Sequence, residues 1–244
     1  MSYLITLAGI IGSGKSSLSA ILAQELGTTA FYEPVADNPV LPLFYQGLEI
    51  AAQKRAAGEL DATNPYTYLL QTFFLNRRFK MIKSAMQHEN NILDRSIYED
   101  AMFMQMNTDL GNASLIEHET YKELLDNMLE ELPQVAQNKN PDLMVMIQVS
   151  YDTMLNRIKK RGRDYEQIEN DPSLINYYQT LLKYYDNWAK TYDKSPLLII
   201  DGDKYDFVEN KDDQNFVLDL IEEKLFELGK ISQAEFIELQ NKRK

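Results

Sequence analysis

The sequence predicts an α/β fold in which a doubly wound, five-stranded parallel sheet carries helices on both faces. Five short apolar runs alternate with longer segments of helical pattern, and a glycine-rich loop joins the first run to the first helix. Each run is apolar without alternation, which is typical of parallel strands buried on both faces. The expected strands cover residues 3–8, 29–32, 91–93, 143–149 and 197–200.

Helical segments are expected between the strands and after the last one. Gly27 ends the first helix and Gly162 breaks a later one, as glycine commonly does at helix C-termini. Glu117 follows Ser114 at the spacing of a capping box. The polar tail after Gly229 is expected to be a loosely attached helix. The expected helices cover residues 15–26, a short segment near Tyr45, 48–58, 66–87, 97–106, 114–132, 153–161, 173–191 and a segment from about Asp213.

The composition is that of one folded domain. The chain has 244 residues, of which 44% are hydrophobic and 25% are charged. No linker, repeat or low-complexity stretch divides it. We expect a single domain over residues 1–244, with a surface insertion at about 46–64 and a peripheral C-terminal tail at 230–244.

Charge and cysteine content exclude several classes of function. The net charge of −12 argues against a nucleic acid polymer as partner, because phosphate backbones require basic patches. The absence of cysteine excludes disulfides, thiol nucleophiles and zinc–thiolate sites, and it fits a reducing compartment. The first residues lack the basic region of a signal peptide, and no apolar run reaches the ~18 residues that span a bilayer. A cytoplasmic protein without a membrane partner is expected.

The glycine-rich loop, GIIGSGKS at residues 9–16, has the pattern GxxxxGK[ST] between an expected strand and an expected helix. Its glycines let successive N–H groups surround phosphate oxygens, and the helix N-terminus adds partial positive charge. Lys15 is expected to reach the β- and γ-phosphates, and Ser16 to hold Mg²⁺. An ordinary glycine turn is the alternative, which the full pattern disfavours. The expected ATP-binding residues here are Gly9, Gly12, Ser13, Gly14, Lys15, Ser16 and Ser17.

The phosphate loop alone does not distinguish among nucleotide-triphosphate proteins. The string NKDD at 210–213 matches the guanine-reading N-K-x-D of GTPases, but it follows a polar stretch rather than an apolar strand. Motor and AAA-type ATPases need a longer chain or an apolar strand that ends in paired acids. Small-molecule and nucleotide kinases need little beyond what this chain contains.

Charged side chains follow two of the expected strands. Glu33 comes after the second strand, and Asp94 and Arg95 come directly after the third. The carboxyl ends of strands line the ligand crevice of a doubly wound sheet, which places these groups beside the phosphate loop. Glu33 could accept a proton from an attacking hydroxyl, Asp94 could join the magnesium shell, and Arg95 could touch the transferred phosphoryl group. The alternatives are an acid in solvent and a salt-bridged helix start.

Arg157, Arg161 and Arg163 form a basic cluster around the glycine break after the fourth strand. Basic residues at such a position can close over phosphates and neutralise the charge of a transition state, which predicts a lid. The alternative is a solvated basic helix end, which is favourable at a helix C-terminus.

Together these motifs resemble the deoxynucleoside kinases, and most closely the bacterial deoxyadenosine/deoxyguanosine kinases. The resemblance extends over residues 3–229. It rests on the phosphate loop, Glu33-Pro34, YLLQTFFLNRRF around Gln71, Asp94-Arg95-Ser96, RIKKRGRDYE at 157–166 and DGDK at 201–204. It implies a P-loop kinase fold with a lid, and ATP- and Mg²⁺-dependent phosphorylation of the 5′-hydroxyl of a deoxynucleoside for salvage. A homodimer is implied as well.

The resemblance also implies residue roles. Glu33 takes the proton of the 5′-hydroxyl, Arg95 orients Glu33 and the phosphoryl group, and Lys15 completes the catalytic set. Tyr45 and Glu166 match positions that hold the sugar 3′-hydroxyl, and the loop over 201–207 resembles one that covers the adenine of ATP. The further ATP-binding residues are Arg157, Arg161, Arg163, Asp203, Lys204 and Tyr205. The substrate-binding residues are Glu33, Tyr45, Gln71, Arg78, Arg95, Asp100 and Glu166.

A purine preference follows from the residues expected at the base. Gln71 and Arg78 are about two turns apart on one helix and share a face, and an amide offers a base edge both a donor and an acceptor. An Arg78–Asp100 pair, implied by the resemblance, suits the amine of adenine or cytosine. Thymine would offer Asp100 no donor, at a cost of roughly 1–3 kcal/mol. Deoxyadenosine is expected first, then deoxyguanosine or deoxycytidine. Alternatively, Asp100 and its neighbour Glu99 face water.

Two other functions remain open from the sequence. A nucleoside monophosphate kinase of the thymidylate kinase type would need further basic residues for the phosphate of its acceptor, and few besides Arg77 and Arg78 are near the acceptor motifs. A non-catalytic nucleotide switch would have no use for an acceptor base such as Glu33.

The segment between Tyr45 and Gln71 is longer than in the bacterial deoxynucleoside kinases that the chain resembles.

Overall fold

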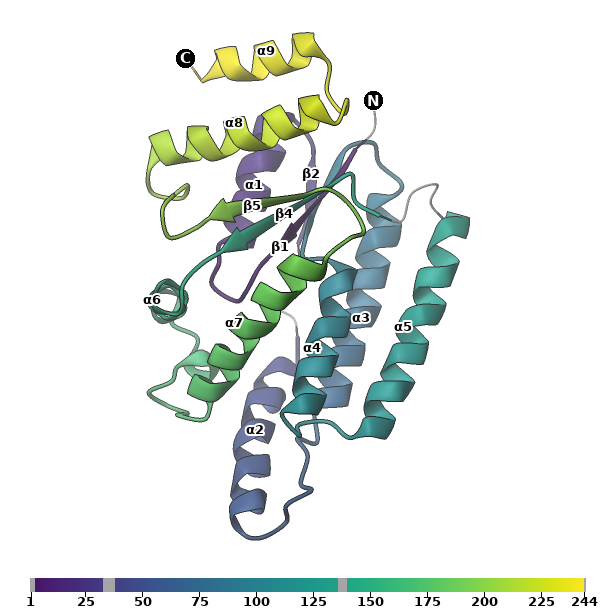
Figure 1. Ribbon diagram of the computed structural model, residues 1–244, viewed down its shortest axis with the longest axis vertical. Coiled ribbons are helices and arrows are strands. Elements are labelled where there is room, and N and C mark those ends of the chain that lie inside the picture. Colours follow the sequence, from purple (N-terminus) through teal and green to yellow (C-terminus); the bar gives the residue numbers. More distant parts are fainter. Residues whose placement is uncertain (1–2, 33–37, 136–139, 244) are drawn as a thin grey trace.

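The computed structural model describes residues 3–32, 38–135 and 140–243, and the five expected strands form one parallel sheet. The strand order β2-β3-β1-β4-β5 confirms the doubly wound arrangement, because the chain winds from β1 first to one edge and then to the other (Figure 1). The strands are β1 (Leu4–Ala8), β2 (Thr29–Phe31), β3 (Asn91–Asp94), β4 (Leu143–Gln148) and β5 (Leu197–Asp201).

The crevice of the fold lies at the carboxyl end of β1. This strand pairs with β3 on one side and β4 on the other, in a register that sets Leu7 beside Asp94 and Ala8 beside Met146. Since the direction of winding reverses at β1, the loops after β1 and β3 meet at one edge of the sheet. The register therefore brings the phosphate loop next to the Asp94-Arg95-Ser96 motif.

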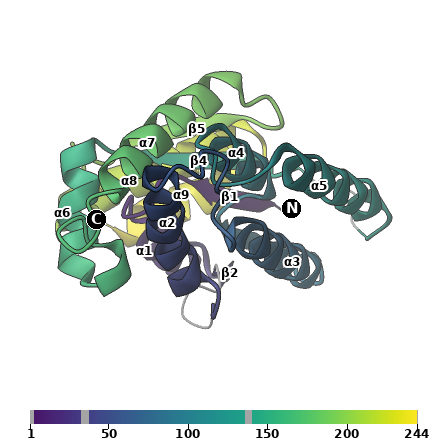
Figure 2. The same ribbon diagram turned by 90° about the horizontal axis from the view of Figure 1, so that it is seen from below.

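Helices cover both faces of the sheet. In Figure 1, α1 and α8 lie on one side, and α3, α4 and α7 lie on the other, with α5 packed outside α3 and α4. Seen from below in Figure 2, α2 lies between the α6–α7 side and the α3–α5 side of the molecule. The helices are α1 (Lys15–Leu26), α2 (Leu41–Ala56), α3 (Thr67–Ala85), α4 (Ile97–Asp109), α5 (Leu115–Val135), α6 (Tyr151–Arg161), the 3₁₀ turn η1 (Asp164–Glu166), α7 (Leu174–Thr191), α8 (Lys211–Glu227) and α9 (Gln233–Lys242).

The sequence analysis was wrong about the helix that contains Tyr45, because α2 is one continuous helix rather than two. Pro42 lies in its first turn, where a missing N–H costs no hydrogen bond. Gly47 lies within this helix, and the Asn64 side chain packs against that position. A Cβ at Gly47 would lie 2.0 Å from Asn64 Oδ1. The glycine therefore permits a close approach rather than a turn.

The segment expected to be a surface insertion forms the second half of α2 and the loop to α3. Its tip is exposed, with Leu60 80% accessible, whereas Asn64 at its end is fully buried. The Asn64 side chain donates to Phe44 O at 2.9 Å, and its backbone N–H donates to Asn112 O. Arg55 donates to Gly111 O at 2.6 Å. The exposed tip is thus tied at its base to both α2 and the α4–α5 loop.

The C-terminal tail is attached more firmly than the sequence suggested. Helix α9 packs on α8, and the rings of Phe226 and Phe236 stack with centroids 5.2 Å apart. Beyond α9, Arg243 is almost fully buried and ion-pairs with three carboxylates. These belong to Glu25, Asp219 and Glu222. In the part of the chain that the structure describes, no helix has the length and apolarity to cross a bilayer.

Candidate active site

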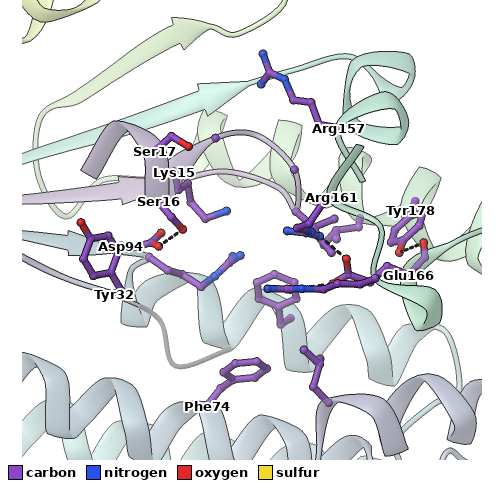
Figure 3. A pocket seen from close by; sticks show the side chains of 18 of the residues that line it. Lys15, Ser16, Ser17, Tyr32, Phe74, Asp94, Arg157, Arg161, Glu166 and Tyr178 are labelled. Carbon is purple, nitrogen blue, oxygen red and sulfur yellow. Dashed lines mark hydrogen bonds and ion pairs between the residues drawn. The ribbon is translucent and has the colours of Figure 1, made fainter. Parts of the chain in front are cut away.

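A cavity of about 630 Å³ opens at the carboxyl edge of the sheet, between the phosphate loop, α2, α3, α4 and the α6–α7 side (Figure 3). Apolar side chains form much of its wall, among them Leu41, Phe44, Phe74, Phe103 and Leu181. Most of the residues expected to bind ATP, substrate or metal line it together. These are Gly12, Gly14, Lys15, Ser16, Ser17, Tyr45, Gln71, Arg78, Asp94, Arg95, Asp100, Arg157, Arg161, Arg163 and Glu166.

The phosphate loop wraps around the Lys15 side chain. Lys15 Nζ donates to Gly9 O at 2.7 Å and to Ile10 O at 3.0 Å. Gly9 and Gly14 have φ of 141° and 102°, and a Cβ at Gly9 would lie 2.6 Å from Ile147 O. These positions demand glycine on conformational and steric grounds. Gly9 and Ser13 are not among the residues that line the cavity.

Ser16 and Asp94 form the part of the site that suits a divalent cation. Ser16 Oγ donates to Asp94 Oδ2 at 2.5 Å, and Asp94 is 2% exposed. The other carboxylate oxygen, Asp94 Oδ1, is buried without a hydrogen-bond partner in the structure. Mg²⁺ prefers oxygen ligands and commonly uses one or two protein groups, with phosphates and waters completing its shell. The hydroxyl and the carboxylate therefore fit Mg²⁺ held together with a bound triphosphate.

Arg95 is held in a strained backbone conformation at the end of β3. Its φ of 86° lies in the region that non-glycine residues rarely adopt. Its Nη1 donates to Tyr185 Oη at 2.5 Å and to Glu99 Oε1 at 3.1 Å. The guanidinium carbon lies 5.0 Å from the centre of the Phe103 ring. These contacts fix the guanidinium beside the phosphate loop.

Arg78 and Asp100 form a buried ion pair in the wall of the cavity. Arg78 Nε, from α3, donates to Asp100 Oδ2, from α4, at 2.6 Å, and both side chains are 2% exposed. Gln71 lies on the same helix as Arg78 and is 3% exposed. Asp100 therefore does not face water, and neither does its neighbour Glu99, which is fully buried. Gln71, Arg78 and Asp100, the three residues expected to hydrogen-bond with the base of the substrate, therefore lie in the same wall of the cavity.

Tyr45 and Glu166 meet on the opposite side, where the lid begins. Burial raises the pKa of Tyr45 well above its usual value, with further contributions from Tyr178 and Glu166. The Glu166 carboxylate accepts from Arg161 Nη2 at 2.5 Å and from Arg163 Nη1 at 3.2 Å. Tyr178 Oη donates to the Glu166 carbonyl at 3.0 Å. In this structure the arginines expected to bind ATP thus contact the carboxylate that was expected to hold the sugar hydroxyl.

Arg157 links the phosphate loop to the loop that follows β5. It donates to Ser13 O at 2.8 Å and to Gly202 O at 2.9 Å. Asp203, Lys204 and Tyr205, from the loop expected to cover adenine, do not line the cavity. Asp203 accepts from the Ser150 N–H, Lys204 lies over the Tyr205 ring, and Tyr205 stacks on Phe216. Val208 and Glu209, slightly further along, do line it.

Sequence reasoning missed several residues of this site. Glu99 accepts from Gly9, Arg95 and Tyr185. Tyr177, Tyr178 and Tyr185 reach the site from α7. The aromatic richness of that helix was a usable signal, whereas nothing in the spacing of Glu99 marks it as buried. Glu33, the expected general base, lies outside the described residues.

The strand order, the phosphate loop and the acidic and basic groups at the strand ends define a P-loop phosphotransferase. Residues 5–226 match the family described as deoxynucleoside kinase. The chain belongs to the deoxynucleoside kinase family. This decides between the two enzyme classes left open by the sequence, and it makes the chain a nucleoside kinase rather than a monophosphate kinase.

Several relatives match along nearly the whole chain. A deoxyguanosine kinase of Lactobacillus acidophilus is 55% identical over 93% of this chain and 92% of its own length. A deoxyadenosine kinase of the same organism is 51% identical over 95% of this chain and 100% of its own length. The solved deoxyadenosine kinase from M. mycoides with bound dCTP is 29% identical, covering 92% of this chain and 99% of its own, with a TM-score of 0.67.

Proposed function

We propose that the enzyme uses ATP and Mg²⁺ to phosphorylate the 5′-hydroxyl of purine deoxynucleosides, with deoxyadenosine preferred over deoxyguanosine and deoxycytidine. The products would be deoxynucleoside monophosphates for salvage. The observation that carries this proposal is the buried Arg78–Asp100 pair beside Gln71 in the cavity wall. The similar chains include both a deoxyguanosine kinase and a deoxyadenosine kinase, which supports a purine substrate without ranking the two bases.

The base preference follows from hydrogen-bonding chemistry. The Gln71 amide can donate to and accept from one edge of a base. Beyond its reach, the Asp100 carboxylate can accept from the exocyclic amine of adenine or cytosine, while Arg78 can donate to N7 of a purine or O6 of guanine. Thymine offers Asp100 a carbonyl and a methyl group, so a desolvated carboxylate would receive no donor from the base. Thymidine is therefore the poorest expected substrate.

In the phosphoryl transfer, different residues at the carboxyl edge of the sheet have different roles. The 5′-oxygen attacks the γ-phosphorus, the bond from this phosphorus to the β–γ bridging oxygen breaks, and ADP leaves. We propose, from the sequence, that Glu33 accepts the hydroxyl proton. Lys15 and Arg95 neutralise charge on the transferred group, and Ser16 and Asp94 would hold Mg²⁺. When bound, Mg²⁺ would neutralise negative charge on the phosphates as the transfer proceeds.

The lid is proposed to exchange partners when ATP binds. Arg161 and Arg163 both contact Glu166 in this structure. A phosphate is a stronger competitor for arginine, since it offers several anionic oxygens to the planar guanidinium fork. Once the arginines turn to the phosphates, Glu166 can accept from the sugar 3′-hydroxyl together with Tyr45. Each ligand would thereby help to prepare the site of the other.

The loop over residues 201–207 is the candidate for binding the adenine of ATP. We propose that Arg157 positions the 201–207 loop against the phosphate loop, and that this loop covers the adenine of ATP with Asp203, Lys204 and Tyr205. On the family resemblance we also propose a homodimer that acts in the cytoplasm, with no nucleic acid or membrane partner.

A coupled assay of ADP formation tests the function directly. The four deoxynucleosides and their four monophosphates are compared as acceptors, with ATP and Mg²⁺ at saturation. We expect turnover with deoxynucleosides, and the highest kcat/KM with deoxyadenosine. Thymidine as the best substrate would contradict the proposed base recognition, and turnover restricted to monophosphates would contradict the proposed acceptor.

A further inference from the structure

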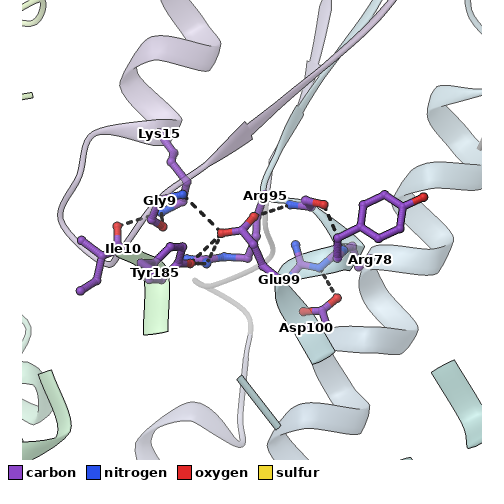
Figure 4. A network of polar contacts seen from close by, with 10 residues as sticks. Gly9, Ile10, Lys15, Arg78, Arg95, Glu99, Asp100 and Tyr185 are labelled. Atoms are coloured by element: carbon purple, nitrogen blue, oxygen red, sulfur yellow. Dashed lines mark hydrogen bonds and ion pairs between the residues drawn. The ribbon is translucent and has the colours of Figure 1, made fainter. Parts of the chain in front are cut away.

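Glu99 is a fully buried carboxylate in the first turn of α4 that the proposed chemistry does not use. One of its oxygens, Oε2, accepts from the Ser96 N–H at 2.8 Å, which completes a capping box. The other, Oε1, accepts from Gly9 N at 3.3 Å, Arg95 Nη1 at 3.1 Å and Tyr185 Oη at 2.6 Å (Figure 4). Helix capping alone needs only the first oxygen.

The contacts of Oε1 connect the phosphate loop to Arg95, the two parts of the site that are proposed to bind phosphate. Gly9 opens the phosphate loop, and its carbonyl accepts from Lys15 Nζ at 2.7 Å. Its N–H, on the other side of the same residue, donates to Glu99. A continuous chain of hydrogen bonds therefore runs from Lys15 through Gly9 and Glu99 to Arg95 (Figure 4).

Tyr185 closes this network from α7. Burial raises the pKa of Tyr185 well above its usual value, so the hydroxyl stays protonated. It can donate to Glu99 Oε1 and accept from Arg95 Nη1 at the same time. The guanidinium of Arg95 is thus held at one nitrogen by both groups, while its backbone keeps the strained φ of 86°.

We propose that Glu99 is a positioning residue that sets the separation and orientation of Lys15 and Arg95 for phosphoryl transfer. This rests on the proposed role of Arg95 in the transfer. A carboxylate is required because both of its oxygens accept. The amide of Gln has one oxygen, so in Glu99→Gln an NH₂ group must face either the Ser96 N–H or the three donors around Oε1.

The test compares Glu99→Gln with two matched controls that remove a carboxylate from a capping box elsewhere. Glu117 caps Ser114 on α5, and Glu235 caps Ser232 on α9, both away from the cavity. We expect Glu99→Gln to lower kcat by about tenfold to a hundredfold, with KM for the deoxynucleoside little changed, because a small misplacement of catalytic groups has an effect of this size. Glu117→Gln and Glu235→Gln should keep the wild-type kcat.

A double-variant cycle separates this inference from the role of Arg95 itself. If Arg95→Ala keeps the wild-type kcat, the proposed role of Arg95 is wrong. If Arg95→Ala loses activity but Glu99→Gln does not, positioning by Glu99 is wrong. If both lose activity, the combined variant should lose clearly less than the product of the two single losses, because part of the Glu99 effect acts through Arg95. Effects that multiply in full would contradict positioning of Arg95 by Glu99. Should Glu99→Gln fail to fold, Glu99→Asp keeps the charge but shortens the reach, and a wild-type kcat for it would overturn the proposal.

Discussion

Arg161 reaches inward from the surface of the lid to contact the buried carboxylate of Glu166, with Nη2 and Oε2 2.5 Å apart. The Arg161 side chain is 34% exposed, whereas that of Glu166 is 1% exposed. The pair joins a group proposed to bind phosphate to a group proposed to bind the sugar. We therefore expect closure of the lid over ATP and binding of the deoxynucleoside to be linked through this carboxylate.

Glu166→Gln is expected to raise KM for the deoxynucleoside, because the sugar hydroxyl loses a charged acceptor. Hydrogen bonds to charged groups contribute about 1.5–3 kcal/mol, which corresponds to roughly tenfold to a hundredfold in kcat/KM. Steady-state kinetics with each substrate varied in turn measures this. Glu169→Gln is the control, since Glu169 pairs with Lys159 on the same lid but is well exposed. Equal effects of the two substitutions would remove Glu166 from the sugar site.

Glu33→Gln is expected to retain ATP binding and to lose most turnover. General base catalysis contributes about a hundredfold to ten-thousandfold, and the amide cannot accept the hydroxyl proton. ATP affinity from equilibrium titration and kcat at saturating substrates give the two quantities separately. An unchanged kcat would exclude Glu33 as the base.

Asp100→Ala is expected to change both stability and substrate choice. Truncating one partner of a buried ion pair commonly costs about 3–5 kcal/mol, here because the Arg78 guanidinium loses its carboxylate. Among the folded molecules, the advantage of deoxyadenosine over thymidine should shrink. Denaturant unfolding measures the first effect, and kcat/KM for the four deoxynucleosides measures the second. A variant with the wild-type order of substrates would show that Asp100 serves stability alone.

Asn64→Ala is expected to weaken the wall of the substrate cavity. The Phe44 carbonyl would lose its donor, and a space would open beside Gly47 on α2, the helix that also carries Tyr45. The expected loss of stability is about 1–3 kcal/mol, together with a higher KM for the deoxynucleoside. Leu60→Ser, at the exposed tip of the same segment, is the control and should alter neither quantity. If both variants behave alike in unfolding and kinetic measurements, the base of this segment does not brace the cavity.

Arg243→Ala is expected to destabilise the protein more at pH 8 than at pH 5. Burial raises the pKa of Glu222 even with Arg243 beside it, and loss of Arg243 raises that pKa further. A carboxyl group whose folded pKa exceeds its unfolded pKa favours the folded state less as pH rises between the two values. Thermal unfolding of wild type and variant across this range provides the measurement. A destabilisation that is independent of pH would show that Glu222 does not carry the effect.

Local sequence patterns were sufficient for much of the fold and part of the site. The five strands, the exact span of α1 and the phosphate loop follow from short-range signals, such as continuous apolar runs and glycines that the backbone itself requires. The neighbouring positions of Lys15, Ser16 and Asp94 also follow, because parallel strands bring their carboxyl ends to one edge. Motif order along the chain then indicated the family.

The tertiary structure alone decided which charged side chains are buried and what they contact. Glu99 and Asp100 are adjacent on one helix and could equally have faced water. Packing of α4 against α3 and α7 buried both, and it paired Asp100 with Arg78 and Glu99 with Arg95. Likewise, the requirement for glycine at position 47 arises only because Asn64, from the loop before α3, packs against it. Spacing specifies the face of a helix, but only the neighbouring elements determine whether that face meets solvent or another charge.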